Sequence, residues 1–210
     1  CSKFELTTEL KGLPKLLKAN LPNNFERYYA KQSLIKPGNP ILVIRKEHKK
    51  VDSTFMLWGL LAEWSNNPFN LPRPFNARAE TITKNNFFKS SWRHRRCLIP
   101  ASGFFEKSSR IRKKDFQPFW LAGLWNRWLA QDGSEIESCT VITTEPNELI
   151  KPLHNRMPVI IPAGFEESWL NQADIYRLNA LEPLLNAWSP TSWVAEPTHK
   201  SQNNSQMSLF

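Results

Sequence analysis

The sequence is short of the residue types that build disulfide frameworks and metal centres. Its three cysteines, at positions 1, 97 and 139, form no CxxC pair. An odd, sparse set of this kind favours a reducing compartment over a disulfide scaffold. Its four histidines, at positions 48, 94, 154 and 199, lie far apart and lack the spacing of metal ligands. We therefore expect neither a metal ion nor another cofactor.

Long apolar runs are also missing. No stretch approaches the roughly 20 residues that are needed to cross a bilayer. The first ten residues, CSKFELTTEL, carry neither an apolar signal region nor a small-residue cleavage pattern. We expect a cytoplasmic protein that has no membrane partner.

Acidic residues are outnumbered. The chain has 19 acidic and 28 basic residues, which gives a formal charge of +9 and a pI near 9.6. This balance favours a polyanionic partner such as nucleic acid. The nine tryptophans point the same way, because an indole can stack on an exposed base. The alternative is that most of them pack in the core.

Glycine is scarce, with seven residues against sixteen prolines, which predicts short, rigid connections. We expect a helix at 8–19 that is interrupted at Pro14, the start of a helix at 77–82, and short helices at 166–171 and 174–188. The predicted strands are 41–48, 55–64, two within 95–107, 118–130, 138–145 and 158–162, with a QDGSE turn before the strand at 138–145. Together these predict one α+β domain over residues 1–193, with an antiparallel sheet or open barrel as its core and short helices around it. Residues 194–210 are polar, and we expect a loose tail there.

The chain begins with cysteine, so one residue carries both a free α-amine and a thiol. The amine can condense with an aldehyde, and the thiol can then close on the imine carbon to form a five-membered thiazolidine. Both groups reach reactive forms near neutral pH. The plainer alternatives are an ordinary first residue left by trimming of an initiator methionine, or the lipid-bearing first residue of an exported protein.

Three further segments place reactive side chains close together in the sequence. Asn76, Arg78 and Glu80 would share one face if their segment is extended, whereas a helix start with a surface Arg–Glu pair is the alternative. Glu106 ends an aromatic strand beside a Pro–Gly corner, where a carboxylate is either a desolvated general acid or the first exposed residue after the strand. His154 lies two residues from Arg156, which pairs a proton-transfer group with a phosphate-binding fork, although a histidine at a strand start is usually structural.

The order of these motifs resembles the SOS-response-associated peptidase (SRAP) family. The resemblance rests on the N-terminal cysteine followed by WGLLAEW at 58–64, NARAET at 76–81, RRCLIPASGFFE at 95–106 and HNRMPVIIP at 154–162. This family includes the hydroxymethylcytosine-binding protein of embryonic stem cells and its bacterial relatives. The resemblance covers residue 1 to about residue 193.

The resemblance implies a protein of the DNA damage response that binds single-stranded DNA in a basic groove and crosslinks itself to abasic sites through a thiazolidine. The residues that it implies for the site are Cys1 as nucleophile, Asn76 holding the Cys1 end, Glu106 as the acid that opens the sugar ring, His154 in proton transfer, and Lys3, Arg78, Lys107 and Arg156 on the DNA. The two arginines would help to keep the amine neutral by like-charge repulsion. No metal or cofactor is implied. We expect a monomer that, in a bacterium, is associated with the nucleoid.

Two positions depart from the family pattern. Lys107 stands where the family commonly has tryptophan, which puts a base contact there in doubt but leaves a phosphate within reach. Lys3 replaces the usual arginine and loses its bidentate geometry. Trp58 and Trp64 match a family motif, and we expect them mostly in the core, with one at the groove.

Two other functions remain open. One is an N-terminal-nucleophile cysteine peptidase that removes at least its own initiator methionine, and a related possibility is lyase-like activity on the abasic strand. The other is a module that binds single-stranded DNA without a covalent step.

Overall fold

A computed structural model describes residues 1–171 and 175–198 of the chain. Its strands are β1 (Phe4–Leu6), β2 (Gln32–Ile35), β3 (Pro40–Glu47), β4 (Lys50–Trp58), β5 (Asn76–Arg78), β6 (Arg96–Ala101), β7 (Gly103–Glu106), β8 (Ser109–Lys113), β9 (Phe119–Leu129), β10 (Glu135–Thr144), β11 (Met157–Pro158), β12 (Ile160–Ile161) and β13 (Trp193–Pro197). Its α-helices are α1 (Lys15–Lys18), α2 (Lys89–His94), α3 (Glu166–Leu170) and α4 (Ile175–Leu181).

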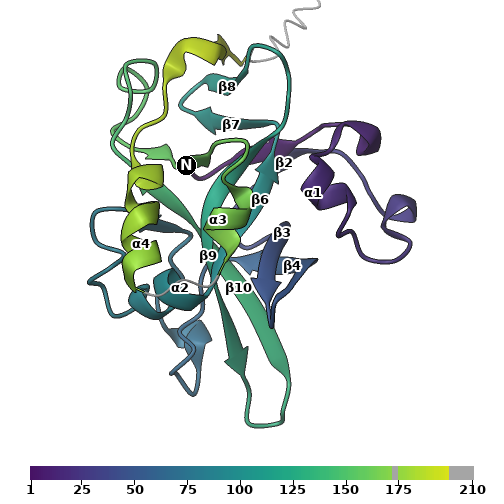
Figure 1. The fold of residues 1–210 in the computed structure, drawn as a ribbon, viewed down its shortest axis with the longest axis vertical. Coiled ribbons are helices and arrows are strands. Elements are labelled where there is room, and N and C mark those ends of the chain that lie inside the picture. The colour runs from purple at the N-terminus through teal and green to yellow at the C-terminus, as the bar shows by residue number, and fades with distance from the viewer. Residues whose placement is uncertain (172–174, 199–210) are drawn as a thin grey trace, which may run out of the picture.

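Five strands close into a barrel. The order β10–β4–β3–β6–β9 returns to its start because β9 also pairs with β10 over seven residue pairs, Glu135↔Leu129 to Val141↔Gly123. All of these pairings are antiparallel except the one between β10 and β4. The strands therefore form a closed barrel where the sequence predicts an open one, and the long β9–β10 hairpin extends to the bottom of the view in Figure 1.

The barrel interior is filled by alternating apolar side chains of the long strands. Val43, Ile99, Leu121 and Val141 share one face of these strands by register and are fully buried, as expected for strands with one face in a core. Gly123 lies where β6, β9 and β10 crowd together, and a Cβ there would be 2.8 Å from the Cys97 sulfur. Only the smallest residue fits at this position.

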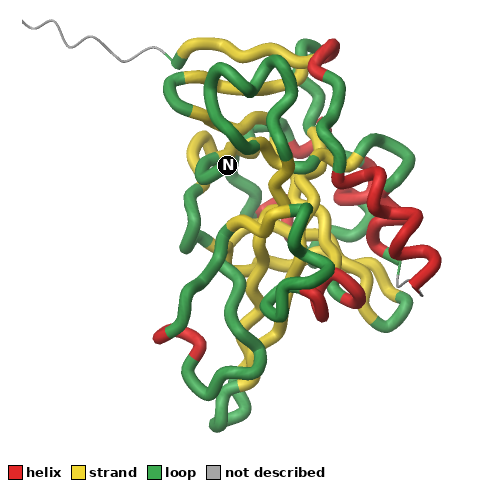
Figure 2. The backbone as a smooth tube through the Cα atoms, turned by 90° about the vertical axis from the view of Figure 1, so that its left-hand side faces the viewer, coloured by secondary structure: helices red, strands yellow, loops and turns green. Residues whose placement is uncertain are grey.

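A second sheet, in the order β13–β8–β7–β1–β2, lies at the top of Figure 1. β6 runs into β7 through Ser102, so the two sheets are joined by continuous chain, and the Phe104 ring packs edge-on against Phe119 at 6.5 Å. Figure 2 shows the strands running through the middle of the molecule, with the largest helix at one side. None of the helices in the described part of the chain is long and apolar enough to cross a membrane.

Most predicted elements are confirmed, with three corrections. The helix expected at 77–82 is wrong, because residues 76–78 form β5 against β10 and only turns follow. The strand expected at 55–64 ends at Trp58, since Gly59 has a φ of +137° that breaks the extended run. The tail expected from residue 194 is wrong for residues 194–197, which belong to β13 and pair with β8. Residues 199–210 of that tail lie outside the described part.

Candidate catalytic site at the N-terminal cysteine

The pairing of β1 with β7 brings the first residue to the end of β7. Phe4 is opposite Phe104, and the Phe105 N–H donates to the Lys3 carbonyl at 2.9 Å. The chain end is thereby directed to Glu106, whose Oε1 lies 3.0 Å from the Cys1 α-amine. Two residues that are 105 positions apart thus form an ion pair because of strand register.

This ion pair is almost completely enclosed. Cys1 is 4% exposed and Glu106 is 7% exposed. A buried carboxylate is costly unless it is paired, and the ammonium provides the pairing here. The charged group in contact with the amine is therefore a carboxylate. The sequence predicts that Arg78 and Arg156 repel the ammonium, but the ion pair that the structure shows is with Glu106.

The thiol of Cys1 lies beside its own amine, and its Sγ donates to the Lys3 carbonyl at 3.7 Å. The other two thiols differ in setting. Cys97 and Cys139 are completely buried in the barrel, and desolvation raises the pKa of each well above the usual value for cysteine. Thiolate is the reactive form, so neither barrel cysteine is suited to act as a nucleophile.

Asn76 holds Cys1 from the opposite side. β5 lies parallel to β10, with Asn76 opposite Val141 and Arg78 opposite Thr143. The Asn76 Nδ2 donates to the Cys1 carbonyl at 2.9 Å, while its Oδ1 is buried and has no hydrogen-bond partner in the described structure. Ala77 between them is buried, so Asn76 and Arg78 lie on the other face of β5, as the extended interpretation of NARAET predicts.

Arg156 forms an ion pair with Glu80. Its Nη1 and Nη2 donate to the two carboxylate oxygens at 2.8 Å each, and Nη2 also donates to the Thr143 carbonyl at 2.8 Å. This bidentate hydrogen bonding lowers the pKa of Glu80. The pair fastens the segment before β11 to the turn after β5, next to the end of β10.

His154 stays at the surface. Its Nδ1 accepts from the Arg156 backbone N–H at 3.1 Å, so the ring is oriented by its own loop. Among the described residues, no hydrogen bond or ion pair joins its side chain to Cys1, Asn76 or Glu106. The structure thus brings together three of the four expected catalytic residues and shows no contact between the fourth, His154, and the other three.

The two lysines of the expected DNA-binding set, Lys3 and Lys107, are exposed. Lys3 carries its side chain outward while its carbonyl binds the Cys1 thiol and the Phe105 N–H. Lys107 follows Glu106 in a left-handed conformation, with a φ of +50°, and its Nζ donates to the Pro152 carbonyl at 3.1 Å. It therefore ties the end of β7 to the turn that carries His154.

A cavity of about 490 Å³ adjoins the site. Asn76, Arg78, Trp64 and Phe87 are among the side chains that line it, and we call it the Trp64 cavity. Trp64 is 68% exposed, whereas Trp58 is fully buried and donates from its indole to the Phe75 carbonyl at 2.9 Å. One tryptophan of the WGLLAEW motif is thus core and the other is presented to solvent, in agreement with the sequence-based expectation.

Sequence reasoning missed the part played by Thr143, Thr144 and Pro152, whose backbone carbonyls and strand pairings hold the site loops. No side-chain pattern signals a backbone acceptor.

In the described residues no group of three or more His, Cys, Asp or Glu side chains could hold a metal ion.

The comparisons with known proteins identify the family of the chain. The profile of the SOS response associated peptidase (SRAP) family matches residues 1–205. The chain belongs to the SRAP family. Among its relatives, it is 30% identical over 219 residues to the abasic site processing protein YoqW of Bacillus subtilis, covering 96% of each chain. It is 33% identical over 183 residues to YoaM of the same organism, also named an abasic site processing protein, covering 80% of this chain and 81% of that one.

Solved structures show the same SRAP fold. A Bordetella bronchiseptica protein aligns with a TM-score of 0.79 at 22% identity, covering 95% of this chain and all of that one. A Bacteroides thetaiotaomicron protein aligns with a TM-score of 0.77 at 24% identity, covering 93% and 90%. The expected single domain with a strand-built core and small peripheral helices is therefore confirmed.

Proposed function

We propose that this protein binds single-stranded DNA that contains an abasic site and captures the site covalently through Cys1. The observation that carries the proposal is the enclosed contact between the Cys1 amine and the Glu106 carboxylate, at 3.0 Å, with Asn76 on the Cys1 carbonyl. Relatives that match almost the whole chain are named abasic site processing proteins, which supports the same substrate.

The reaction begins with a proton transfer. Glu106 takes a proton from the Cys1 ammonium, which leaves a neutral amine that can attack the aldehyde of the open sugar. The carbinolamine so formed loses its hydroxyl as water when Glu106 returns the proton, giving the protonated imine. Glu106 then takes the proton from the imine nitrogen, which leaves the neutral imine. Glu106 is suited to these transfers because its Oε1 already contacts the nitrogen of the Cys1 amine.

The thiol completes the reaction. The Cys1 sulfur adds to the imine carbon and its proton passes to the ring nitrogen, so aldehyde, amine and thiol become a thiazolidine and one water. The product no longer contains an imine, so the strand is protected from β-elimination. The unpaired Oδ1 of Asn76 is an acceptor for a sugar hydroxyl or the new ring N–H.

The burial of Cys1 supports selectivity for a nucleotide without a base. The thiol side chain is fully enclosed, so any sugar must displace neighbouring side chains to reach it, and a sugar without a base needs less room than a complete nucleotide. The Trp64 cavity lies next to Asn76 and offers an exposed indole on which a neighbouring base can stack.

Arg78 and Lys3 are the cations best placed for backbone phosphates, since both residues are exposed and neither side chain makes a hydrogen bond in the described structure. Arg78 lies near enough to Glu80 to help lower the pKa of that carboxyl. Arg156 can contact a phosphate only if that phosphate shares or displaces Glu80. Lys107 would have to give up the Pro152 carbonyl. Glu106 is also assigned as the acid that helps to open the sugar ring, and the exposed His154 as a group that assists proton transfer.

The proposal is tested with Cys1→Ala and Cys1→Ser proteins and an abasic single-stranded oligonucleotide. We expect the alanine variant to give no denaturation-resistant adduct and the serine variant to give at most a reversible imine, which borohydride traps. Cys139→Ala is the matched control, because it removes a thiol that is buried in the barrel, and it should crosslink like the wild type. Full crosslinking by Cys1→Ala would refute the proposal.

Two further measurements separate the alternative functions, the peptidase and the non-covalent DNA-binding module. Multiple-turnover cleavage of a peptide in trans that is lost in Cys1→Ala would favour the peptidase. Equal binding of intact and abasic strands with no covalent product would favour the non-covalent module.

A further inference from the structure

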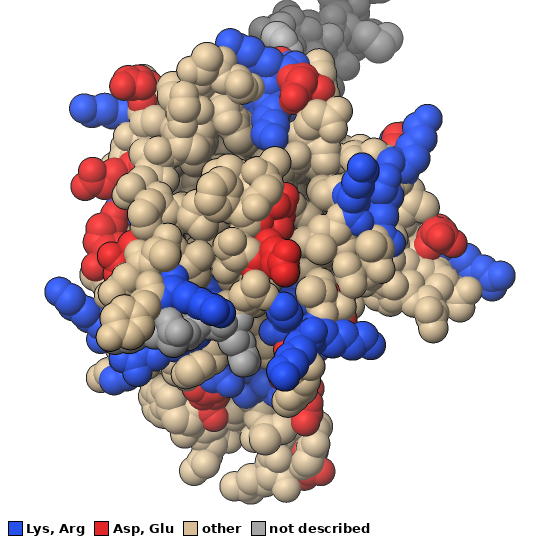
Figure 3. All heavy atoms as spheres, viewed as in Figure 1, with Lys and Arg blue, Asp and Glu red and all other residues tan. Residues whose placement is uncertain are grey.

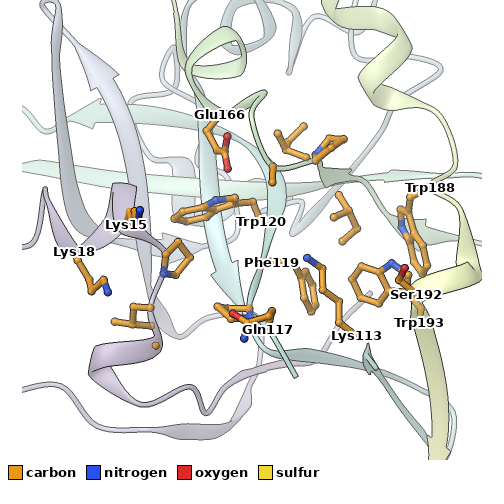
Figure 4. A pocket seen from close by; sticks show the side chains of 18 of the residues that line it. Lys15, Lys18, Lys113, Gln117, Phe119, Trp120, Glu166, Trp188, Ser192 and Trp193 are labelled. Atoms are coloured by element: carbon orange, nitrogen blue, oxygen red, sulfur yellow. The ribbon is translucent and has the colours of Figure 1, made fainter. Parts of the chain in front are cut away.

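A second cavity lies among α1, α3 and the end of the top sheet. It measures about 770 Å³, and none of the residues proposed for the Cys1 site lines it. Figure 4 shows Lys15 and Lys18 on one wall, Trp188 and Trp193 on the opposite wall, and Trp120 between them. We call it the Trp120 cavity.

The cations of the Trp120 cavity are available to a ligand. Lys15 and Lys113 have no hydrogen-bond or ion-pair partner for their ammonium groups among the described residues. Lys18 uses one of its three donors on the Lys11 carbonyl, at 2.9 Å. In Figure 4 the Lys113 ammonium points into the cavity, and in Figure 3 basic side chains gather over α1 at the right of the view.

The remaining walls are mostly aromatic and aliphatic, with one carboxylate. Trp120 and Trp193 are buried apart from their cavity edges, and Trp188 is held in place by its indole hydrogen bond to the Pro158 carbonyl at 3.0 Å. Glu166 is half-buried on the α3 side, with its carboxylate toward Trp120. A ligand must therefore be anionic at the lysine rim, flat and apolar in its body, and able to donate a hydrogen bond to Glu166.

We infer that the Trp120 cavity binds a nucleotide unit of single-stranded DNA outside the reactive abasic position. The phosphate faces Lys15 and Lys113, the base contacts the aromatic edges, and an exocyclic amino group donates to Glu166. An acidic peptide fits less well, because its carboxylates would face Glu166. This inference rests on the proposed function for its choice of nucleic acid, and it adds a second contact to the same strand.

The test uses an intact oligodeoxycytidine of about six nucleotides, a length within the usual range for one binding surface. This probe has no aldehyde, so its binding does not depend on reaction with Cys1. Lys15→Gln/Lys113→Gln should weaken binding at low salt by on the order of fivefold and reduce the salt dependence of log K by about 0.7 for each lost phosphate contact. Lys36→Gln/Lys50→Gln is the control of equal charge, since both lysines are exposed and lie outside the cavity, and it should change the salt slope less.

A photoreactive version of the same probe should label residues 113–120 or 188–193. Binding and salt slope equal to those of the control pair, or labelling confined to other segments, would overturn the inference. Tighter, lysine-dependent binding of an acidic peptide of equal charge would overturn it in favour of a protein partner. Failure of the crosslinking proposal is seen separately, as an adduct that survives in Cys1→Ala.

Discussion

Glu106 has two tasks at the scale of single residues. It neutralises the chain end in a buried setting, and it is the base within 3.0 Å of the amine that must lose a proton. A carboxylate is suited to both tasks, because it stabilises the ammonium at rest and accepts its proton when the aldehyde arrives.

We expect Glu106→Gln to slow crosslinking at pH 7 by about 100-fold or more, which is the usual contribution of a general acid–base group. The measurement is the single-turnover rate of adduct formation at pH 7, with Glu145→Gln as a control for loss of an exposed carboxylate. An unchanged rate at pH 7 would show that Glu106 is only a counter-ion.

The residues of the site were predictable from the sequence to different degrees. Cys1, Asn76 and Glu106 were found from their chemistry and motif order, and strand register brings them together. The partner of Arg156 was not found, because the sequence places Glu80 beside Arg78 and does not show that the Arg156 fork reaches it across 76 positions. Long-range pairing of this kind depends on how the strands are ordered.

At the scale of elements, the Glu80–Arg156 pair connects the turn after β5 with the segment before β11. Glu80 has a lowered pKa in the folded protein because of its hydrogen bonds to Arg156. A group of this kind stabilises the fold at pH values above its unfolded pKa, and that stabilisation is lost as the pH falls through the folded pKa.

We therefore expect the wild type to melt at a higher temperature than Glu80→Gln at pH 7, and we expect the difference to shrink as the pH falls below the ordinary pKa of a glutamate side chain. Thermal unfolding of both proteins across this range measures it, and Glu145→Gln, whose carboxylate has no ion-pair partner in the described structure, should show a smaller pH dependence. A Glu80→Gln deficit that is constant with pH would mean that packing, not charge, connects the two segments.

The elements themselves were predicted where periodicity was strong. The alternating strands at 41–48, 118–130 and 138–145 are found close to those limits, whereas 77–82 was taken for a helix start although Asn76–Arg78 pairs with β10. A three-residue strand has no period of its own, so only its partner defines it. β13 was also missed, because its five residues show no alternation of apolar and polar side chains and are defined as a strand only by their pairing with β8 at the sheet edge.

At the scale of the whole molecule, closure of the barrel fixes the distance between the two sides of the site. Asn76 belongs to β5, which pairs with β10, and Glu106 ends β7, which continues from β6. Because β9 pairs with both β10 and β6, the two sides of the site are connected through these three neighbouring strands of the barrel. The cavities of the molecule were not predictable, because the Trp120 cavity draws its walls from segments that are far apart in the chain.

Gly123→Ala tests how tightly the barrel is closed. The added Cβ would lie 2.8 Å from the Cys97 sulfur and 3.1 Å from the Thr140 carbonyl oxygen. We expect a loss of about 1–3 kcal/mol in the free energy of unfolding, as for overpacked cores. Denaturant unfolding measures it, and adding Cys97→Ala should recover part of the loss by removing the shortest contact. A neutral Gly123→Ala substitution would mean that β9 can shift.

The central claim is that the α-amine and the thiol of Cys1 act together on one sugar carbon. The most direct measurement is the mass of the N-terminal peptide after the protein is incubated with abasic single-stranded DNA, denatured and digested without a reducing agent. We predict a stable adduct on residue 1 whose mass is that of peptide plus sugar fragment less one water, with no thiol left to alkylate. An adduct on a lysine, or one on residue 1 that leaves the thiol open to alkylation, would contradict the account.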